Sequence, residues 1–240
     1  MFYFKFGDFK KVVVFLHGWG SDSSSFLWVK DYIDYCSTLF VDFPAFGKSD
    51  EPDQVWTVSD YVKELKKILD KFEIDELVLV GHSFGGRVAI KFASFYQNKY
   101  RRFKVCLIDS AGILPRRSLF YKIKVAKFKK LKLKAEKRLD VKNKLDGYGS
   151  DDYKKLSPLM KKTFVNIVNE DLSLDAKILN CECLIIWGKN DKETKLYMAR
   201  RLHSLIKKSK LVIFNNAGHF SFLDQKEEFL ILLDTFIKNL

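Results

Sequence analysis

The chain of 240 residues lacks the features that mark a membrane or a secreted protein. No apolar run approaches the ~20 residues that a membrane-spanning helix needs. Residues 1–6 lack the charged start, the apolar middle and the small-residue cleavage site of a signal peptide. Internal repeats and low-complexity linkers are also missing. Because 47% of the residues are hydrophobic, the chain can bury one sizeable core, and we expect a single cytoplasmic domain.

Cysteine and histidine are both scarce, with four of each in the chain. Cys181 and Cys183 are two residues apart, but no second pair of cysteines or histidines accompanies them at metal-ligand spacing. We therefore expect four buried, reduced thiols. The sequence implies neither a metal nor an organic cofactor.

Acidic residues are scarce in one part of the chain only. Residues 111–162 hold 17 Lys/Arg and 5 Asp/Glu, a net charge of +12, whereas the remainder holds 26 and 25. The overall net charge of +13 thus belongs to one segment and not to the fold. No recognised nucleic-acid module accompanies this charge, so we expect no nucleic-acid partner.

Short apolar runs with turn residues behind them predict seven strands. They cover residues 2–6, 12–16, 38–42, 77–80, 104–109, 184–187 and 211–214. Helical periodicity is found over residues 26–35, 58–72, 84–96, 195–206 and 226–240. This alternation predicts an α/β fold, in which a mostly parallel central sheet carries helices on both faces.

The alternation breaks between residues 109 and 184. There the pattern predicts a basic helix over 118–139, a polar turn over 146–151 and a second helix over 152–168. The insertion emerges at the carboxyl ends of the strands, where open α/β sheets bind ligands. We expect residues 1–110 and 181–240 to form the core, and residues 111–180 to form a helical, lysine-rich cap over the site.

Residues 81–86, Gly-His-Ser-Phe-Gly-Gly, fit the pattern Gly-x-Ser-x-Gly between an apolar strand and a helix. A serine on so sharp a strand-to-helix turn is a nucleophile elbow. Glycines are needed there because the turn is too tight for side chains. The turn lifts the Ser83 hydroxyl above the sheet, and we predict that Ser83 is a nucleophile.

A serine nucleophile needs a base and an orienting acid. His219, in the loop after the last strand, is the candidate base. Asp191, a few residues past the preceding strand, is the candidate acid. Asp109, at the end of another strand, is the fallback acid.

The nucleophile also needs an oxyanion hole. The glycine-rich loop 17–20 follows an apolar strand, so the Trp19 N–H can converge with the Phe84 N–H. His17 and His82 stand beside these groups and are candidates for substrate contact. Local hydrogen bonding in the turns is the simpler interpretation of both histidines.

Together these motifs resemble the α/β-hydrolase superfamily. The resemblance rests on His-Gly-x-Gly at 17–20, the elbow at 81–86, Trp-Gly-x-x-Asp at 187–191 and Gly-His at 218–219. Residues 42–50 also resemble the family's Asp-x-Pro-Gly-x-Gly-x-Ser loop. The match covers nearly the whole chain, in the family's order of serine, aspartate and histidine. It implies a serine hydrolase with a Ser-His-Asp triad and an acyl-enzyme intermediate.

The chain departs from the family pattern at several positions. Ala45 stands where the family usually has glycine, which is expected to alter that turn slightly. Asp224 replaces a glutamate, a change that we interpret as neutral. A serine at position 83, in place of aspartate, argues against the haloalkane dehalogenase and epoxide hydrolase branches. His82 stands where carbon–carbon bond hydrolases often have asparagine.

Arg87 leaves other chemistries open. Gly85-Gly86-Arg87 resembles a segment of the menaquinone-pathway synthase, an α/β-hydrolase look-alike that performs an elimination. There the arginine helps to hold a carboxylated substrate, so Arg87 is a candidate substrate contact. An arginine in the first turn of a helix is also common in plain esterases. The alternatives are a carbon–carbon bond hydrolase, a lyase, and a protein that binds its ligand without turnover.

The basic stretch 116–134 carries apolar residues at an approximately helical spacing. We favour a cap helix whose apolar stripe covers the site and whose lysines face solvent. Contact with an anionic membrane surface and steering of an anionic substrate are the alternatives. The sequence as a whole predicts a serine esterase acting on a small or medium acyl or aryl ester.

Overall fold

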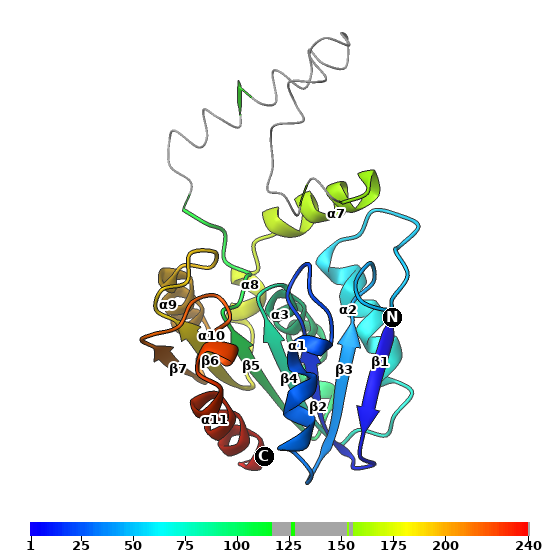
Figure 1. The fold of residues 1–240 in the computed structure, drawn as a ribbon, viewed down its shortest axis with the longest axis vertical. Helices are drawn as coiled ribbons and strands as arrows, with labels where there is room; N and C mark the ends of the chain where they lie inside the picture. Colours follow the sequence, from blue (N-terminus) through cyan, green and yellow to red (C-terminus); the bar gives the residue numbers. More distant parts are fainter. Residues whose placement is uncertain (117–125, 128–152, 154–155, 240) are drawn as a thin grey trace.

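The computed structural model describes residues 1–116, 126–127, 153 and 156–239. Seven strands form one sheet in the order β1-β3-β2-β4-β5-β6-β7 (Figure 1). The strands are β1 (Phe2–Phe6), β2 (Lys11–Leu16), β3 (Ser37–Asp42), β4 (Glu76–His82), β5 (Arg102–Ile108), β6 (Glu182–Gly188) and β7 (Ser209–Phe214). β1 pairs antiparallel with β3 at the edge, and all other pairs are parallel.

The predicted α/β fold with a mostly parallel sheet is confirmed. All seven expected strands are present. The central strands contain continuous apolar runs, as expected for strands that helices cover on both faces. Every residue of β4 is buried, for example, and its Leu79 lies beside Val14 of β2 and Val105 of β5. The elbow therefore begins from the middle of the sheet.

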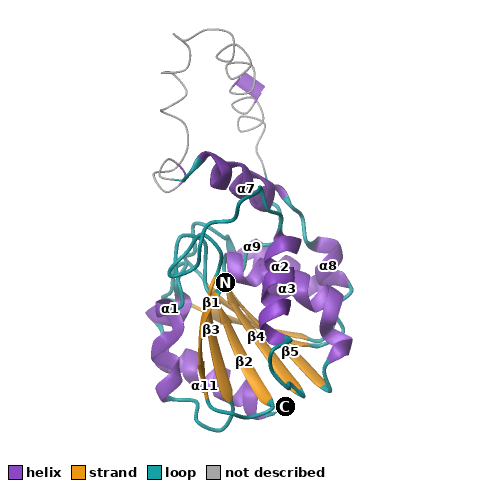
Figure 2. Cartoon of the chain, turned by 90° about the vertical axis from the view of Figure 1, so that its right-hand side faces the viewer, coloured by secondary structure: helices purple, strands orange, loops and turns teal. Residues whose placement is uncertain are grey.

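Helices cover both faces of this sheet (Figure 2). They are α1 (Ser24–Leu27), the 3-10 helices η1 (Trp28–Asp31) and η2 (Gln97–Lys99), α2 (Val58–Leu69), α3 (Phe84–Tyr96), α7 (Pro158–Asn169), α8 (Ser173–Lys177), α9 (Leu196–Leu205), α10 (Ser221–Asp224) and α11 (Lys226–Lys238). Two separate apolar cores result. One lies under α2, α3, α8 and α9, and the other under α1, α10 and α11.

Three helices differ from the sequence prediction. The helix expected over 58–72 ends at Leu69. The helix expected over 26–35 ends at Asp31, because a helix reaching Tyr35 would leave one residue before β3 begins at Ser37. The helix expected over 152–168 begins at Pro158. Proline has no N–H to donate inside a helix, so it takes the first position, and the Ser157 hydroxyl caps the Met160 N–H at 3.1 Å.

The insertion is described only in part. The basic helix predicted over 118–139 and the turn over 146–151 lie outside the described residues, apart from residues 126 and 127. α7 lies beyond the carboxyl ends of the strands (Figure 1). α8 returns the chain to the sheet and packs against α3 and α9. The four cysteines are buried and free. None of the described helices has the length and apolar character needed to cross a membrane.

Candidate active site

Ser83 sits on the turn between β4 and α3 with a strained backbone. Its φ is 49° and its ψ −109°, a conformation that side-chain-bearing residues rarely adopt. Two glycines make the turn feasible. A Cβ on Gly81 would lie 2.5 Å from the carbonyl oxygen of Gly85, and a Cβ on Gly85 would collide with the Leu16 carbonyl. The expected elbow geometry is thus found at the expected residues.

The structure brings Ser83, His219 and Asp191 together from three different loops. The Nε2 atom of His219 lies 3.0 Å from Ser83 Oγ. The other ring nitrogen, Nδ1, lies 2.8 Å from Oδ2 of Asp191. The loops follow β4, β7 and β6, whose carboxyl ends lie at the same edge of the sheet, although β5 separates β4 from β6 and β7. The loops themselves bring the three side chains into contact.

Asp191 is held as a carboxylate by its own loop. Oδ1 accepts from the N–H groups of Glu193 and Thr194 at 2.8 and 3.0 Å, and Oδ2 accepts from the Thr194 hydroxyl at 2.6 Å. Burial acts to raise the pKa of Asp191, but the hydrogen bonds from His219 and Thr194 outweigh it, and the pKa is lowered. Asp191 is therefore ionised at neutral pH and orients the imidazole.

The carboxylate of Asp191 changes the pKa of His219. Burial lowers the pKa of its imidazole, whereas the hydrogen bond and the charge of Asp191 raise it by more, so the net shift is upward. A raised pKa means that the ring accepts a proton from Ser83 more readily than an ordinary histidine does.

The glycine loop after β2 passes directly beside the elbow. A Cβ on Gly18 would lie 2.8 Å from His82 Nδ1 and 3.5 Å from Ser83 Cβ. The Trp19 ring packs on the Phe84 ring at a centroid distance of 5.3 Å. The two residues whose N–H groups were expected to form the oxyanion hole are thus adjacent across the elbow.

His17 supports this loop from below. Its Nδ1 lies 2.7 Å from the Gly18 carbonyl, and its Nε2 accepts the Phe43 N–H at 2.9 Å. The side chain has no exposed surface, and burial lowers its pKa. These contacts favour a structural role for His17 over contact with a substrate.

His82 also bonds within the protein. Its Nε2 lies 2.7 Å from the carbonyl oxygen of His219. Only 2% of the residue is exposed. Burial lowers the pKa of this histidine to about 3, so the ring is neutral at physiological pH.

Arg87 binds the main chain at the end of α7. Its guanidinium donates to the Glu170 carbonyl at 2.7 Å, and the residue is only 4% exposed. Burial lowers its pKa to about 10, which leaves it charged. Lys91, one helical turn further along α3, pairs with Glu170 and Asp175. α3 thus anchors the segment that leads from α7 to α8.

Asp109, the fallback acid, has other partners. Its Oδ1 accepts from the Gly188 N–H at 2.7 Å, and its Oδ2 accepts from the N–H and hydroxyl of Ser221 at 3.0 and 2.5 Å. Burial raises its pKa to about 7 despite these bonds. Asp109 therefore ties β5 to the loops that carry Asp191 and His219.

Sequence reasoning missed Thr194 and Ser221 as supports of these loops. The recognised motifs end at Asp191 and His219. They do not mark Thr194, three residues after Asp191, or Ser221, two residues after His219. A Thr or Ser shortly after a loop carboxylate or histidine could have been tested as a side chain that bonds locally.

Four aromatic side chains cluster around Trp19 on the glycine loop, and we call them the aromatic wall: Trp19, Phe46, Phe84 and Phe164. Trp19 is central, with ring centroids at 4.9 Å from Phe46, 5.3 Å from Phe84 and 5.1 Å from Phe164. Phe164 comes from α7, so the described part of the insertion contacts the glycine loop beside the elbow.

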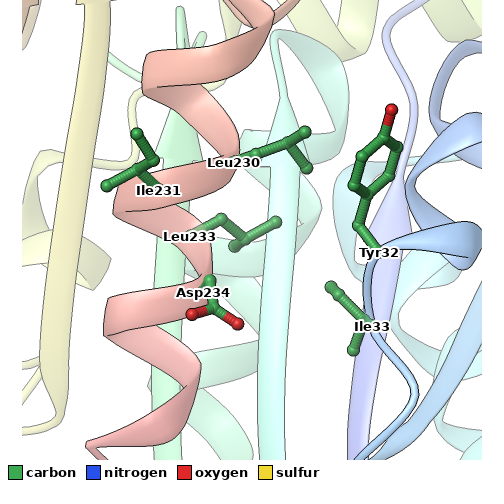
Figure 3. A pocket seen from close by; sticks show the side chains of 6 residues that line it. All are labelled: Tyr32, Ile33, Leu230, Ile231, Leu233 and Asp234. Atoms are coloured by element: carbon green, nitrogen blue, oxygen red, sulfur yellow. The ribbon is translucent and has the colours of Figure 1, made fainter.

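A separate pocket lies beside the core under α1, α10 and α11, between the end of η1 and α11 (Figure 3). Its lining is Tyr32, Ile33, Leu230, Ile231, Leu233 and Asp234. Most of these side chains are aliphatic, and the six lining residues do not include a nucleophile in contact with a base. We assign no chemistry to it.

Comparisons with known proteins identify the family and the fold. A family model described as "Alpha/beta hydrolase family" matches residues 13–230. A proline iminopeptidase of Saccharolobus solfataricus is 29% identical, over 94% of this chain and 84% of that protein. The structure is similar to an esterase from Exiguobacterium antarcticum, with TM-score 0.76, 21% identity and coverage of 99% and 95% of the two chains. It is also similar to a meta-cleavage product hydrolase from Pseudomonas fluorescens, with TM-score 0.73, 22% identity and coverage of 99% and 93%.

Proposed function

Since the chain belongs to the alpha/beta hydrolase family, we propose that it is a serine hydrolase that cleaves an ester-type bond. The observation that carries the proposal is the chain of contacts from Ser83 through His219 to Asp191, at 3.0 and 2.8 Å. Nucleophile, base and orienting acid need this arrangement.

The reaction follows from these positions. Ser83 Oγ attacks the ester carbonyl carbon while His219 Nε2 takes its proton, and the carbonyl oxygen becomes an oxyanion. The N–H groups of Trp19 and Phe84 hold that oxyanion, and each such donor contributes about 3–4 kcal/mol to the transition state. His219 then protonates the leaving alcohol. Water repeats the sequence on the acyl-enzyme and releases the acid.

The aromatic wall supports a substrate with an apolar acyl or aryl group. Its rings stand beside the oxyanion loop, where the part of the ester next to the carbonyl has to lie. Aromatic faces bury apolar groups well and accept planar rings at offset or edge-on angles. We infer a small-molecule substrate of small or medium size, covered by a cap of residues 111–180.

Hydrolysis of p-nitrophenyl esters tests this function. The wild-type protein is expected to cleave acetate, butyrate and benzoate esters better than palmitate. Ser83→Ala should lower kcat by about 10⁴-fold or more, as loss of a triad serine does elsewhere. The matched control is Ser204→Ala, which removes an exposed hydroxyl on α9 and should leave kcat unchanged. Retained turnover in purified Ser83→Ala would contradict the assignment.

Carbon–carbon bond hydrolysis or elimination on a carboxylated substrate is the second candidate. It is favoured by the likeness to the meta-cleavage product hydrolase and by Arg87 next to the elbow. The bond from Arg87 to Glu170 argues for an anchoring role of the arginine instead.

Arg87→Ala separates the two candidates when a neutral and a carboxylated ester are compared. An anchoring arginine predicts the same proportional loss of kcat/KM for both esters. Selective loss of the carboxylated ester would favour the second candidate.

A further inference from the structure

His82, the residue before the proposed nucleophile, contacts the proposed base through its main chain. Its Nε2 lies 2.7 Å from the carbonyl oxygen of His219. A carbonyl oxygen can only accept, so Nε2 must carry the proton and donate it. The neutral ring is thus fixed in the Nε2–H tautomer.

The ring of His82 is clamped on its sides. Phe220 and Phe222 lie against it at centroid distances of 5.0 and 5.1 Å. Phe222 in turn stacks on Phe26 in the core, at 4.5 Å. On the Nδ1 side, a Cβ on Gly18 would lie only 2.8 Å from the ring, so a glycine is needed there. A buried ring held in this way cannot swing out of its bond to His219.

The bond joins the backbones of the two reacting residues. His82 is linked by a peptide bond to Ser83, and the oxygen that it holds belongs to His219 itself. Other ties fix the same loop elsewhere: Gly218 N–H donates to Asp224 at 2.7 Å, and Ser221 is bound to Asp109. Those hydrogen bonds fix the position of the His219 loop relative to α10 and β5. The hydrogen bond from His82 fixes its position relative to the elbow.

We propose that His82 is a positioning residue for the proposed hydrolysis, which holds the His219 carbonyl so that the imidazole stays within reach of Ser83 Oγ. This inference rests on the proposed function. Its physical basis is that a nucleophile and base must keep near-attack geometry, and a displacement of about 1 Å can cost about 10²-fold in rate. The His82 ring also lies against the His219 ring, at a centroid distance of 4.9 Å, but its hydrogen bond goes to the His219 carbonyl and not to the imidazole nitrogens.

Two substitutions at position 82 test the role. His82→Phe keeps an aromatic ring between Phe220 and Phe222 but removes the donor, and His82→Gln puts an amide N–H near the position of Nε2. We expect kcat to fall about 10–100-fold in His82→Phe, with KM within about twofold. His82→Gln should restore most of the lost kcat. His203→Phe, the same change on the surface of α9, is the control and should behave as wild type.

Hydrogen exchange of residues 217–221 is the second readout, and it does not depend on turnover. Faster exchange in His82→Phe, with wild-type exchange in His82→Gln, supports the role of His82. Wild-type kcat and exchange in His82→Phe would overturn it, because packing alone would then be enough. Equal losses in both variants would also overturn it, because the amide donor of His82→Gln would then restore nothing. If the wild-type protein hydrolyses no ester, the proposed function fails, while the exchange result still decides whether His82 holds the loop.

Discussion

The backbone strain at Ser83 shows how much of the local structure serves one hydroxyl group. A side-chain-bearing residue with φ of 49° costs about 1–3 kcal/mol, and it persists only where its surroundings impose it. The surroundings here are Gly81 and Gly85, which let strand, turn and helix approach without a Cβ between them. The strain exposes the serine to His219.

The pKa of His219 predicts the pH dependence of the reaction. The imidazole must be neutral to take the proton from Ser83, and its pKa is raised by Asp191. Activity should therefore be lost as the pH falls through a value above 6.5, the ordinary pKa of histidine. The measurement is kcat/KM for a p-nitrophenyl ester between pH 5 and 9.

Asp191→Asn is the matched variant for this pH profile. Without the carboxylate, burial dominates and the pKa of His219 should fall, so the acid limb moves to lower pH. Loss of the orienting charge should also lower kcat by about 10⁴-fold. An acid limb that stays in place in Asp191→Asn would contradict the assignment of Asp191.

Ala45 is a second strained position, and it predicts a gain in stability. Its φ is 74°, so the turn keeps the left-handed backbone of the glycine that the family usually has there. The left-handed backbone costs an alanine about 1–2 kcal/mol of stability, and glycine removes this strain. Glycine also loses more conformational freedom on folding, which costs about 0.5–1 kcal/mol and offsets part of the gain. Ala45→Gly should therefore stabilise the protein by about 0.5–1 kcal/mol.

Thermal unfolding measures this effect. An increase in Tm of about 1–4 °C is expected for a chain of this length. Ala89→Gly, the same change in the buried interior of α3, should instead lower the Tm, since glycine weakens a helix and leaves a small void. A lower Tm in Ala45→Gly would refute the strain at this turn.

Among the elements, strands were predicted better than helices. A buried parallel strand contains a short continuous apolar run, such as Leu77–Val80 in β4 and Leu184–Trp187 in β6. Helix ends depend on single residues instead. Pro158 moved the start of α7, and the short α8 and α10 contain too few residues to show a helical period.

The residues of the candidate site were predicted where a motif marks them. Ser83, Asp191 and His219 each follow a recognisable strand, so their convergence could be expected from the sheet. The bond from His82 to the His219 carbonyl could not, because its acceptor is a backbone atom that carries no sequence signal. The partner of Arg87 was missed for the same reason.

The docking of α7 gives a prediction at the scale of one element. The Thr163 hydroxyl, fully buried, accepts the Trp56 N–H at 3.0 Å and ties α7 to the loop before α2. Thr163→Val keeps the shape but leaves that N–H unpaired, at a cost of about 1–3 kcal/mol. Because α7 carries Phe164 onto Trp19, its loosening should raise KM for an aryl ester about threefold to tenfold.

Steady-state kinetics on p-nitrophenyl benzoate and acetate measure this change. Thr163→Ser keeps the hydroxyl and is the control, with KM near that of wild type. The increase in KM should be larger for benzoate than for acetate, since the aromatic wall is the proposed contact of the aryl group. Equal KM values for Thr163→Val and wild type would show that α7 does not help to bind substrate.

At the scale of the whole molecule, the sheet prearranges the site. Each proposed active residue follows the carboxyl end of a different strand: Trp19 after β2, Ser83 after β4, Asp191 after β6 and His219 after β7. Two apolar cores fix those strands on both faces. The proposed machinery is therefore built on the central sheet, and we propose that the insertion adds substrate contacts above it.

The central claim is that Ser83 is an activated nucleophile, and covalent labelling tests it most directly. The native protein is incubated with a fluorophosphonate, and the adduct is located by intact-mass and peptide mass spectrometry. We predict one adduct per chain on Ser83, none in Ser83→Ala and none in heat-denatured protein. An unlabelled native protein would contradict the account and favour a protein that binds its ligand without turnover. A single adduct that persists in Ser83→Ala would contradict it equally.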